Sequence, residues 1–194
     1  MTAIRWLLSQ WKLIAASVVA AAIVHIWLTL SATAHRVSPG YAALAGNLPT
    51  NRVVFLPPLE PGKQPLPFMM PDMLYAICKF DASQAAIRLK VQLPEAGYSL
   101  SLHSRDGANF YFVSGTNERA TDLDVVLQVS GTAFFLPRLQ SSGGRTERPR
   151  VALPGAYGMA VLRVPIKGLA YRRIADEHRD SFSCAPIAKA EARR

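Results

Sequence analysis

The sequence predicts a mainly β protein: an antiparallel β-sandwich or barrel behind one N-terminal transmembrane helix, with a short C-terminal helix. Three observations lead to this prediction. Residues 13–35 contain no Lys, Arg, Asp or Glu. Residues 87–93 alternate apolar and polar side chains, which is typical of a strand with one buried face. Similar short runs recur between turn residues, without the intervening long helices that a βαβ protein would need.

The composition excludes some classes of protein but does not indicate an activity. The chain has 194 residues, of which 50% are hydrophobic and 18% are charged. This is enough for one domain of ordinary size and excludes a disordered or collagen-like chain. Because we find no catalytic signature, metal cage or phosphate loop, we expect no cofactor and no metal.

The uncharged run at 13–35 is long enough to span a bilayer, because about 20 helical residues cover an apolar core of roughly 30 Å. Arg5 and Lys12 precede the run, and only Arg36 follows it closely. Positive charge favours the cytoplasmic side, so we expect residues 1–12 in the cytoplasm and the remainder outside it. This predicts a single-pass protein of the bacterial inner membrane with a periplasmic C-terminal domain.

Two features of this run leave alternatives open. Residues 32–34 read Ala-Thr-Ala, the form of a signal-peptidase site, so removal of the run and secretion of the mature protein is the competing reading. The length of the run favours an anchor, because signal h-regions usually have about 7–15 apolar residues. His25 is an ionisable group inside the run, and it is either a proton relay or a neutral contact between helices.

Two irregular segments follow the predicted anchor. Residues 36–51 show little periodicity and are expected to form a juxtamembrane connection. Six prolines between residues 57 and 71 fix φ and remove backbone donors, so neither a helix nor a central strand fits there. The stretch also matches a PxxP ligand, but we favour an extended segment laid on the domain. Its expected apolar anchors are Leu59, Leu66, Phe68 and Met69.

The β-rich domain is expected at residues 52–187, followed by a frayed tail at 188–194. Its strands are predicted from two-residue alternation and from turn residues such as Gly107. We expect strands at 53–56, 74–80, 87–93, 98–103, 109–113, 123–129 and 159–164. Seven short β segments spaced by turns favour a sandwich or barrel.

The last third of the chain is predicted to hold a loop and a helix. Residues 138–150 contain Ser, Gly and four Arg, and are expected to form an exposed, mobile loop. The spacing from residue 169 to about residue 182 predicts a short amphipathic helix. Its docking residues are expected to be Leu169, Ile174 and Phe182.

Positive charge is concentrated in the same region. The whole chain carries a net charge of +9, and residues 138–194 hold 12 basic and 5 acidic residues. No nucleic-acid-binding motif accompanies this charge, so we expect no nucleic acid partner. Anionic lipid, a wall polymer or an envelope protein are the expected partners, and the competing reading is a solvated basic face. The candidate residues for an anionic surface are Arg138, Arg145, Arg148, Arg150, Arg172 and Arg173.

His103 is central to the enzyme hypothesis. Ser104 and Asp106 are its neighbours in the sequence, but they do not form a recognised nucleophile and base, and no G-x-S-x-G elbow is present. Asp122 and Asp124 share one strand face, either as a carboxylate pair of the kind glycosidases use or as a solvated edge. A pocket that gathers His103 with the two aspartates would favour an enzyme, and their dispersal would favour a binding module.

Two further groups of residues can be interpreted either as a functional site or as part of the structure. The first group falls in the predicted C-terminal helix. We favour a charged helix face over a metal site for it, because the spacing is not that of H-E-x-x-H. That group is Asp176, Glu177, His178 and Asp180. The other group either lines a ligand cavity or fills the core, as aromatic residues on alternating strands usually do. It consists of Tyr98, Phe110 and Phe112.

The chain has two cysteines, Cys78 and Cys184. They fall in the region that is expected to meet an oxidising compartment, where an even number of cysteines favours a disulfide over free thiols. A bridge between them would tie the C-terminal segment to the predicted sheet.

Three segments resemble the bacterial domain of unknown function 1254 family of small single-pass envelope proteins. They are CKFD at 78–81, LPEAGYSLSL at 93–102 and RDGANFY at 105–111. The resemblance covers about residues 65–129, with weaker likeness at 159–165 and near Cys184. It implies a β-rich, jelly-roll-like domain behind a membrane anchor, and it implies no established activity or catalytic residue.

The sequence therefore favours a membrane-anchored extracytoplasmic module that binds a ligand or has a structural role in the cell envelope. One alternative is an envelope hydrolase that acts on a wall polymer or a small ester. The other alternative is a secreted protein released by signal cleavage.

Overall fold

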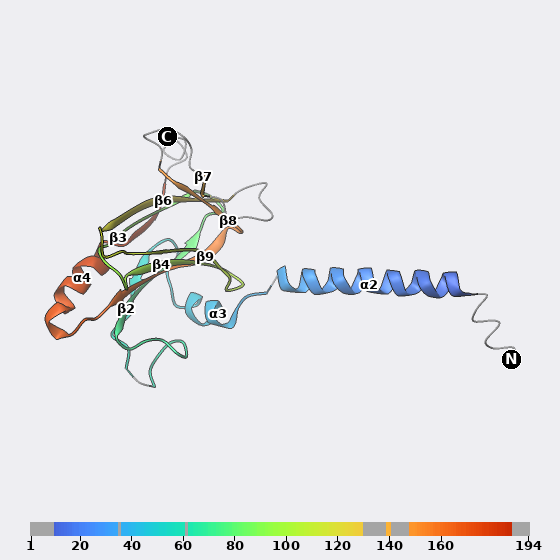
Figure 1. The fold of residues 1–194 in the computed structure, drawn as a ribbon, viewed down its shortest axis with the longest axis horizontal. Coiled ribbons are helices and arrows are strands. Elements are labelled where there is room, and N and C mark those ends of the chain that lie inside the picture. Colours follow the sequence, from blue (N-terminus) through green and yellow to red (C-terminus); the bar gives the residue numbers. More distant parts are fainter. Residues whose placement is uncertain (1–9, 35, 61, 130–138, 141–147, 188–194) are drawn as a thin grey trace. The chain divides into compact units, whose positions relative to one another are not determined.

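The computed structural model describes residues 10–34, 36–60, 62–129, 139–140 and 148–187 (Figure 1). The chain divides into two compact units, Met1–Arg36 and Val37–Arg194. The first unit holds the N-terminal helix, and the second holds all the strands. The second unit begins well before residue 52, so the segment that was expected to be a connection is part of it.

Helix α2 runs over Trp11–Ala34 and has 24 residues. Within it, Trp11–Ala32 is long and apolar enough to cross a membrane, with a mean hydropathy of 2.3. None of this stretch is buried against the rest of the chain. The hydroxyl of Thr29 donates to the carbonyl of His25 at 2.7 Å, so this polar side chain is satisfied within the helix.

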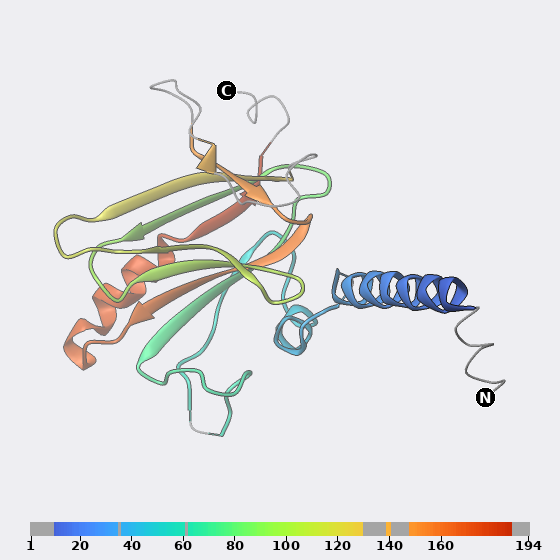
Figure 2. The same cartoon turned by 45° about the vertical axis from the view of Figure 1, so that its right-hand side comes forward.

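The second unit contains two five-stranded sheets, which Figures 1 and 2 show as separate layers. The first sheet has the order β1 (Val53–Phe55), β2 (Met73–Asp81), β9 (Tyr157–Pro165), β4 (Ser99–Ser104) and β5 (Asn109–Ser114). The second has the order β10 (Ser183–Pro186), β3 (Ile87–Leu93), β6 (Thr121–Val129), β8 (Arg150–Leu153) and β7 (Leu139–Gln140). The mainly β class predicted from the sequence is confirmed.

The second sheet is not wholly antiparallel, which corrects the sequence prediction. Strands β6 and β8 pair in parallel, from Val126 with Arg150 to Val129 with Leu153. A parallel pair needs a long return connection, and the chain between these strands supplies one. Two strands also lie within or at the end of the segment predicted to be a loop at 138–150, since β7 and the first residue of β8 fall there.

One apolar core receives side chains from both sheets. Strand β3 shows how the sequence places them, because its residues alternate between buried and less buried along its whole length. The fully buried side chains that fill this core include Leu74, Phe80, Ile87, Leu89, Leu93, Leu100, Leu102, Val125, Leu127, Leu162 and Val164. Burying each such side chain contributes about 1.5–3 kcal/mol, so this shared core is the main source of stability.

A disulfide between Cys78 and Cys184 joins the sheets covalently. Cys78 lies on β2 of the first sheet and Cys184 on β10 at the edge of the second. Their Cα atoms are 6.4 Å apart, within the usual range for a disulfide. Both residues are buried.

A 3₁₀ turn at Leu169–Tyr171 and helix α4 at Arg172–Asp180 connect β9 to β10. The helix contacts strands of both sheets. Phe182 docks as predicted with 3% of its surface exposed, but Ile174 is 40% exposed and the expected docking there is wrong. Ala175, at 1% exposure, faces the sheets instead, because its small side chain lets the helix approach closely.

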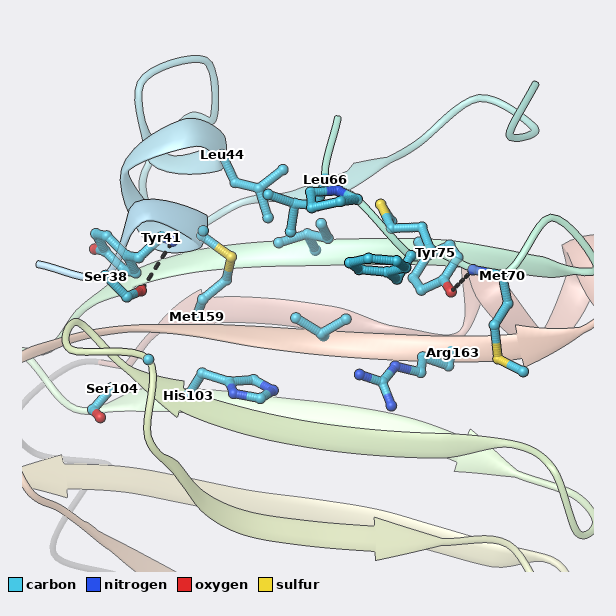
Figure 3. Close-up of a pocket in the computed structure, with 17 residues that line it drawn as sticks. Ser38, Tyr41, Leu44, Leu66, Met70, Tyr75, His103, Ser104, Met159 and Arg163 are labelled. Carbon is cyan, nitrogen blue, oxygen red and sulfur yellow. Dashed lines mark hydrogen bonds between the residues drawn. The ribbon is translucent and has the colours of Figure 1, made fainter. Parts of the chain in front are cut away.

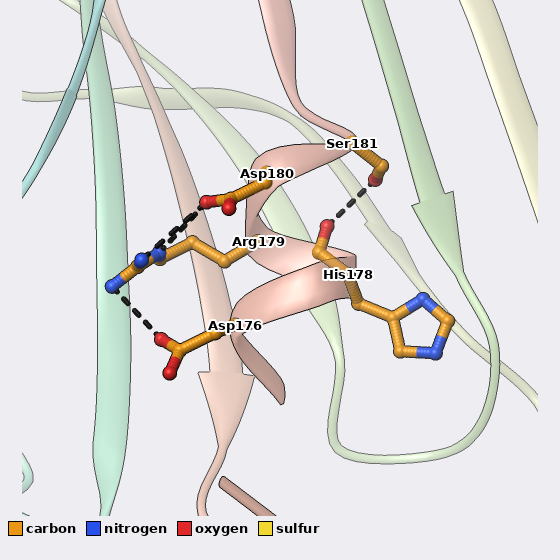
Figure 4. A network of polar contacts seen from close by, with 5 residues as sticks. All are labelled: Asp176, His178, Arg179, Asp180 and Ser181. Carbon is orange, nitrogen blue, oxygen red and sulfur yellow. Dashed lines mark hydrogen bonds and ion pairs between the residues drawn. The ribbon is translucent and has the colours of Figure 1, made fainter. Parts of the chain in front are cut away.

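Arg179 makes ion pairs within α4 and one contact with the first sheet (Figure 4). Its guanidinium lies 3.1 Å from the carboxylate of Asp176 and 3.4 Å from that of Asp180. The same group lies 4.7 Å from the centre of the Phe55 ring on β1. A cation over an aromatic face is attracted to it, so this arginine ties the helix to the edge of the first sheet.

Helix α3 at Pro39–Ala45 lies in the segment predicted to be an irregular connection. Its start follows ordinary capping rules, because the hydroxyl of Ser38 accepts from the backbone N–H of Tyr41 at 3.1 Å and proline takes the first helical position. A second apolar cluster lies between this region and the outer face of the first sheet. Its buried members are Leu48, Ile77 and Met159.

The proline-rich segment contains neither helix nor strand in its described residues, as predicted. Leu59, Leu66 and Met69 are half-buried, consistent with the expected apolar anchors. Phe68 is not an anchor, because 98% of its surface is exposed. Its φ of 64° lies in the left-handed region.

Candidate ligand-binding site

A cavity of about 410 Å³ lies on the outer face of the first sheet (Figure 3). Strands β2, β9 and β4 form its floor, and α3 and residues 66–70 form its walls. All of its lining residues belong to the second unit. The volume is within the range of roughly 300–1,000 Å³ that is typical of small-molecule sites.

The strand register shows which side chains share the face that holds the floor, although Ser99, Ser101 and Lys79 on this face do not line the cavity. Tyr75, Arg163 and Ser99 are neighbours across β2, β9 and β4. The next row on this face, two residues along each strand, contains Ile77, Val161 and Ser101. The third contains Lys79, Met159 and His103. Because side chains alternate between faces, all three rows project away from the shared core.

The walls and most of the floor are apolar. Figure 3 shows Leu44 of α3 and Leu66 of the proline-rich segment above Met159, and Ile77 and Val161 also line the cavity. The hydroxyl of Tyr75 accepts from the backbone N–H of Met70 at 3.1 Å, which fastens one wall to the floor. Burial is the main cause of the raised pKa of Tyr41, so this lining hydroxyl stays protonated.

Arg163 is the charged group of the floor, and it is half-buried. Figure 3 shows its guanidinium and the imidazole of His103 pointing toward one another along the floor. Among the residues that the structure describes, no carboxylate forms an ion pair with Arg163. The cavity is therefore mainly apolar, with one positively charged group on its floor.

His103 is held by its neighbours on the strand. Its Nε2 atom lies 3.0 Å from the hydroxyl oxygen of Ser101, a residue that is 2% exposed. Burial lowers the pKa of His103, a backbone hydrogen bond with Gly107 opposes this, and the charge of Arg163 lowers it further. The imidazole is therefore neutral near pH 7.

Ser104 and Asp106 do not form a catalytic set with His103. The hydroxyl of Ser104 donates to the Asp106 carboxylate and lies 3.1 Å from the carbonyl oxygen of Ala108. The hydrogen bond from Ser104 is the main cause of the lowered pKa of Asp106. These contacts close the turn between β4 and β5, where Gly107 has a φ of +90°.

Asp122 and Asp124 lie on β6 of the second sheet, so the structure does not bring them to His103. Asp124 accepts from Arg88 through both carboxylate oxygens, at 2.8 and 2.6 Å. The Arg88 hydrogen bond is the main cause of its lowered pKa. The three residues named for an enzyme are thus dispersed over two sheets.

The acidic group on α4 has a structural role. Arg179 binds Asp176 and Asp180, while Figure 4 shows His178 pointing away from them. His178 makes an edge-to-face contact with Tyr98, with ring centres 5.7 Å apart. Within the described ranges, no three His, Cys, Asp or Glu side chains are placed to hold a metal ion.

The aromatic residues considered for a cavity lie elsewhere. Tyr98 is buried in the shared core, and Phe110 packs against that core. Phe112 is 57% exposed. None of the three lines the cavity described above.

The predicted arginine surface is divided. Arg172 and Arg173 lie on α4, while Arg150 begins β8 at the opposite side in both ribbon views (Figures 1 and 2). Arg148 lies 3.7 Å from Asp124, and Arg173 lies 2.6 Å from Glu177. Arg138 and Arg145 lie outside the described residues.

Among the lining residues, His103 and Leu66 are predicted from the sequence as a candidate catalytic residue and an apolar anchor, whereas Arg163, Met159 and Tyr41 are not predicted. Arg163 carried a usable signal, because it is the one charged residue in an otherwise apolar predicted strand. The Ser-Pro pair at residues 38–39 is likewise a helix start signal, and it would have placed Tyr41 on a helix.

No family model matches the sequence, and no match to a curated protein was found. Among solved structures, the VPA0106 protein from Vibrio parahaemolyticus is similar, with a TM-score of 0.55 and 12% sequence identity. The likeness covers 78% of this chain and 35% of that one. At this identity the likeness shows the fold alone.

An uncharacterised protein from Burkholderia cenocepacia also matches, with a TM-score of 0.40 and 12% identity over 71% of this chain and 35% of that one. The chain thus spans about a third of the length of both solved proteins.

Proposed function

We propose that the chain is a single-pass module of the bacterial inner membrane whose extracytoplasmic domain binds a ligand on the outer face of its first sheet. The observation that most directly supports a membrane anchor concerns α2. Its stretch Trp11–Ala32 is apolar, exposed and long enough to span a bilayer. Arg5 before the helix and Lys12 in its first turn support a cytoplasmic N-terminus.

Three further observations support this proposal. The disulfide between Cys78 and Cys184 is the kind of bond that persists in an oxidising compartment such as the periplasm. The two sheets around one core fit a β-sandwich of jelly-roll type. The resemblance of residues 65–129 to the domain of unknown function 1254 family implies the same arrangement of anchor and domain.

The dispersal of the candidate catalytic residues favours binding over hydrolysis. His103 lies at the cavity, but Asp122 and Asp124 lie on the other sheet, and Asp124 is engaged by Arg88. A general base needs a substrate proton within reach and, in a triad, an acid that orients it. Within the described part of the chain, His103 has Ser101 and Gly107 as its partners, and neither is an acid.

Reporter fusions test the proposed topology. A periplasm-active enzyme fused after Arg194 should be active, and a cytoplasm-active reporter at the same position should be silent. The reverse pattern would overturn the orientation. The full chain should also stay in the membrane fraction after alkaline washing, whereas a mature N-terminus at His35 and release from the membrane would support the secreted alternative.

A turnover assay separates the module from the hydrolase. The full chain is incubated with small esters and with wall polymer, beside His103→Ala. Binding without turnover is the expected result. Turnover that disappears in His103→Ala would establish the enzyme instead.

A further inference from the structure

Arg163 differs from the basic side chains that have acidic partners. Arg88 binds Asp124, Lys167 lies 2.7 Å from Glu95, and Arg179 lies between two aspartates. Arg163 is half-buried beside an apolar cavity, and no acidic partner is present in the described residues. A partly buried charge costs free energy unless it is paired, so an anionic ligand group would stabilise it.

The other residues that line the cavity indicate the chemical character of the rest of the ligand. The residues that line the same cavity include Ile77, Val161, Leu44 and Leu66, whose side chains offer apolar contact and no hydrogen bonds. A sugar or peptide would leave many of its polar groups unpaired there, at a cost for each. An apolar chain with one anionic end matches both parts of the cavity.

The exposed ring of Phe68 supports the same ligand. Phe68 lies at the cavity edge, is 98% exposed, and holds a φ of 64° that a bulky side chain rarely adopts. Exposure of the ring and an unfavourable backbone conformation both cost stability. An apolar chain in the cavity would give this ring a contact that the domain itself does not provide.

We propose that this cavity binds a free fatty acid, with its carboxylate on the guanidinium of Arg163 and its chain against Leu44, Leu66 and Ile77. A cavity of about 410 Å³ favours one acyl chain over the two of a phospholipid. Arginine suits the carboxylate because its planar fork donates two parallel hydrogen bonds. This inference rests on the proposed function in that it names the ligand class of the same binding site.

The test uses the full chain in lipid nanodiscs and a photoreactive hexadecanoic acid. After illumination, the labelled residues are mapped by peptide mass spectrometry. Labels are expected on residues 66–70 and on the lining residues of β2 and β9. Labels on α2 alone would show that the probe only partitions into the bilayer, and would overturn the inference.

Two other probes define the specificity. A photoreactive hexadecanol of the same chain length tests the carboxylate, and a photoreactive diacyl phosphatidylglycerol tests the number of chains. Labelling of the cavity should be strongest with the acid. Equal labelling by the alcohol would overturn the role of Arg163, and preferential labelling by the phospholipid would overturn the single-chain ligand.

Arg163→Gln should reduce cavity labelling by the acid roughly tenfold and leave labelling by the alcohol nearly unchanged, because a hydrogen bond to a charged group is lost. The matched control is Arg119→Gln, which removes an exposed arginine far from the lining residues in sequence and should change neither. An equal fall with both probes would contradict the charge argument.

Two variants separate loss of the site from loss of the fold. Gly40→Leu adds a side chain toward Leu66, whose Cδ2 is 3.9 Å from the added Cβ, and it improves helix propensity in α3. It should block labelling by both acid and alcohol without lowering the melting temperature. Phe68→Asn keeps a residue that tolerates positive φ and should weaken labelling several-fold. Unchanged labelling in both stable variants would place the ligand elsewhere and overturn the inference.

Different measurements would refute the anchored module and the fatty-acid ligand. Reporter fusions with the wrong orientation refute the extracytoplasmic module even if the cavity is labelled. Correct reporters with an unlabelled cavity leave the anchored module standing and refute the fatty acid.

Discussion

Cys78 of the first sheet and Cys184 of the second are joined by a disulfide although 106 positions separate them in the sequence. Closing a loop of this size restricts the unfolded chain and stabilises the fold by about 4–5 kcal/mol in the chain-entropy description. Replacing both by Ala should therefore lower the free energy of unfolding, by up to this amount. Chemical denaturation of the full chain measures it.

Maleimide labelling checks the bond itself. In denatured protein, both thiols should react only after reduction. Full labelling without reduction would show two free cysteines and contradict the prediction.

Gly158 is predicted to be essential for packing. A Cβ at this position would lie 2.4 Å from the Phe80 ring and 2.6 Å from the His103 carbonyl oxygen. Gly158→Ala should therefore overpack the contact with Phe80 and His103 and lower the free energy of unfolding by about 1–3 kcal/mol. Gly155→Ala is the matched control, because a Cβ there meets nothing within 4 Å. Equal melting temperatures for the two variants would contradict this account.

We expect the free energy of unfolding to fall at acid pH as Asp124 becomes protonated. Its pKa is lowered, chiefly by the Arg88 hydrogen bond, so its contribution is present above the unfolded value of about 3.9 and is lost as pH falls through the folded value. Because its side chain is 38% exposed, we expect Asp124→Asn to cost only about 1 kcal/mol at pH 7. Asp122→Asn, on the same strand, should cost less. Unfolding curves between pH 7 and pH 3 compare them.

His103 should add a second pH dependence. Burial is the main cause of its lowered pKa, so its contribution to stability is present above the unfolded value of about 6.5 and is lost as pH falls through the folded value. His103→Gln should remove this part of the pH profile. NMR titration of the imidazole, assigned by the variant, should give a midpoint below 6.5. A midpoint above 6.5 would contradict the burial argument.

The shared core was predictable because its strands alternate clearly. Residues 87–93 were predicted as a strand with the same bounds that β3 has, since apolar and polar side chains alternate without interruption. Strands β8 and β10 were missed because each has four residues, and Arg150 and Pro186 at their ends give no strand signal. The partners of these strands come from distant parts of the chain, so their pairing is a tertiary effect.

The cavity was harder to predict than the core. Its floor follows from alternation on β2, β9 and β4, but its walls depend on α3 and on the proline-rich segment. Helix α3 has only seven residues, so Tyr41, Leu44 and Ala45, which pack against the second apolar cluster, give less than two turns of helical spacing in the sequence. Phe68 illustrates the same limit, because its apolar character reveals neither its exposure nor its positive φ.

The arginines proposed to bind an anionic surface should act as two separate groups, because α4 and β8 lie apart. Replacing both Arg172 and Arg173 by Ser should weaken capture of nanodisc-held protein by anionic vesicles, and salt should weaken it too. Stability should change by less than about 0.5 kcal/mol, because the Arg173–Glu177 pair is an exposed i,i+4 pair.

Arg148→Ser with Arg150→Ser should instead lower stability, since Arg148 lies 3.7 Å from the Asp124 carboxylate and Arg150 is half-buried at the start of β8. Lys63→Ser with Arg119→Ser removes the same charge from exposed positions and serves as the control. Vesicle capture at low salt and unfolding curves are measured for all three double variants. If the control weakens capture as much as the α4 pair does, net charge alone governs binding and the local arginine group has no special role.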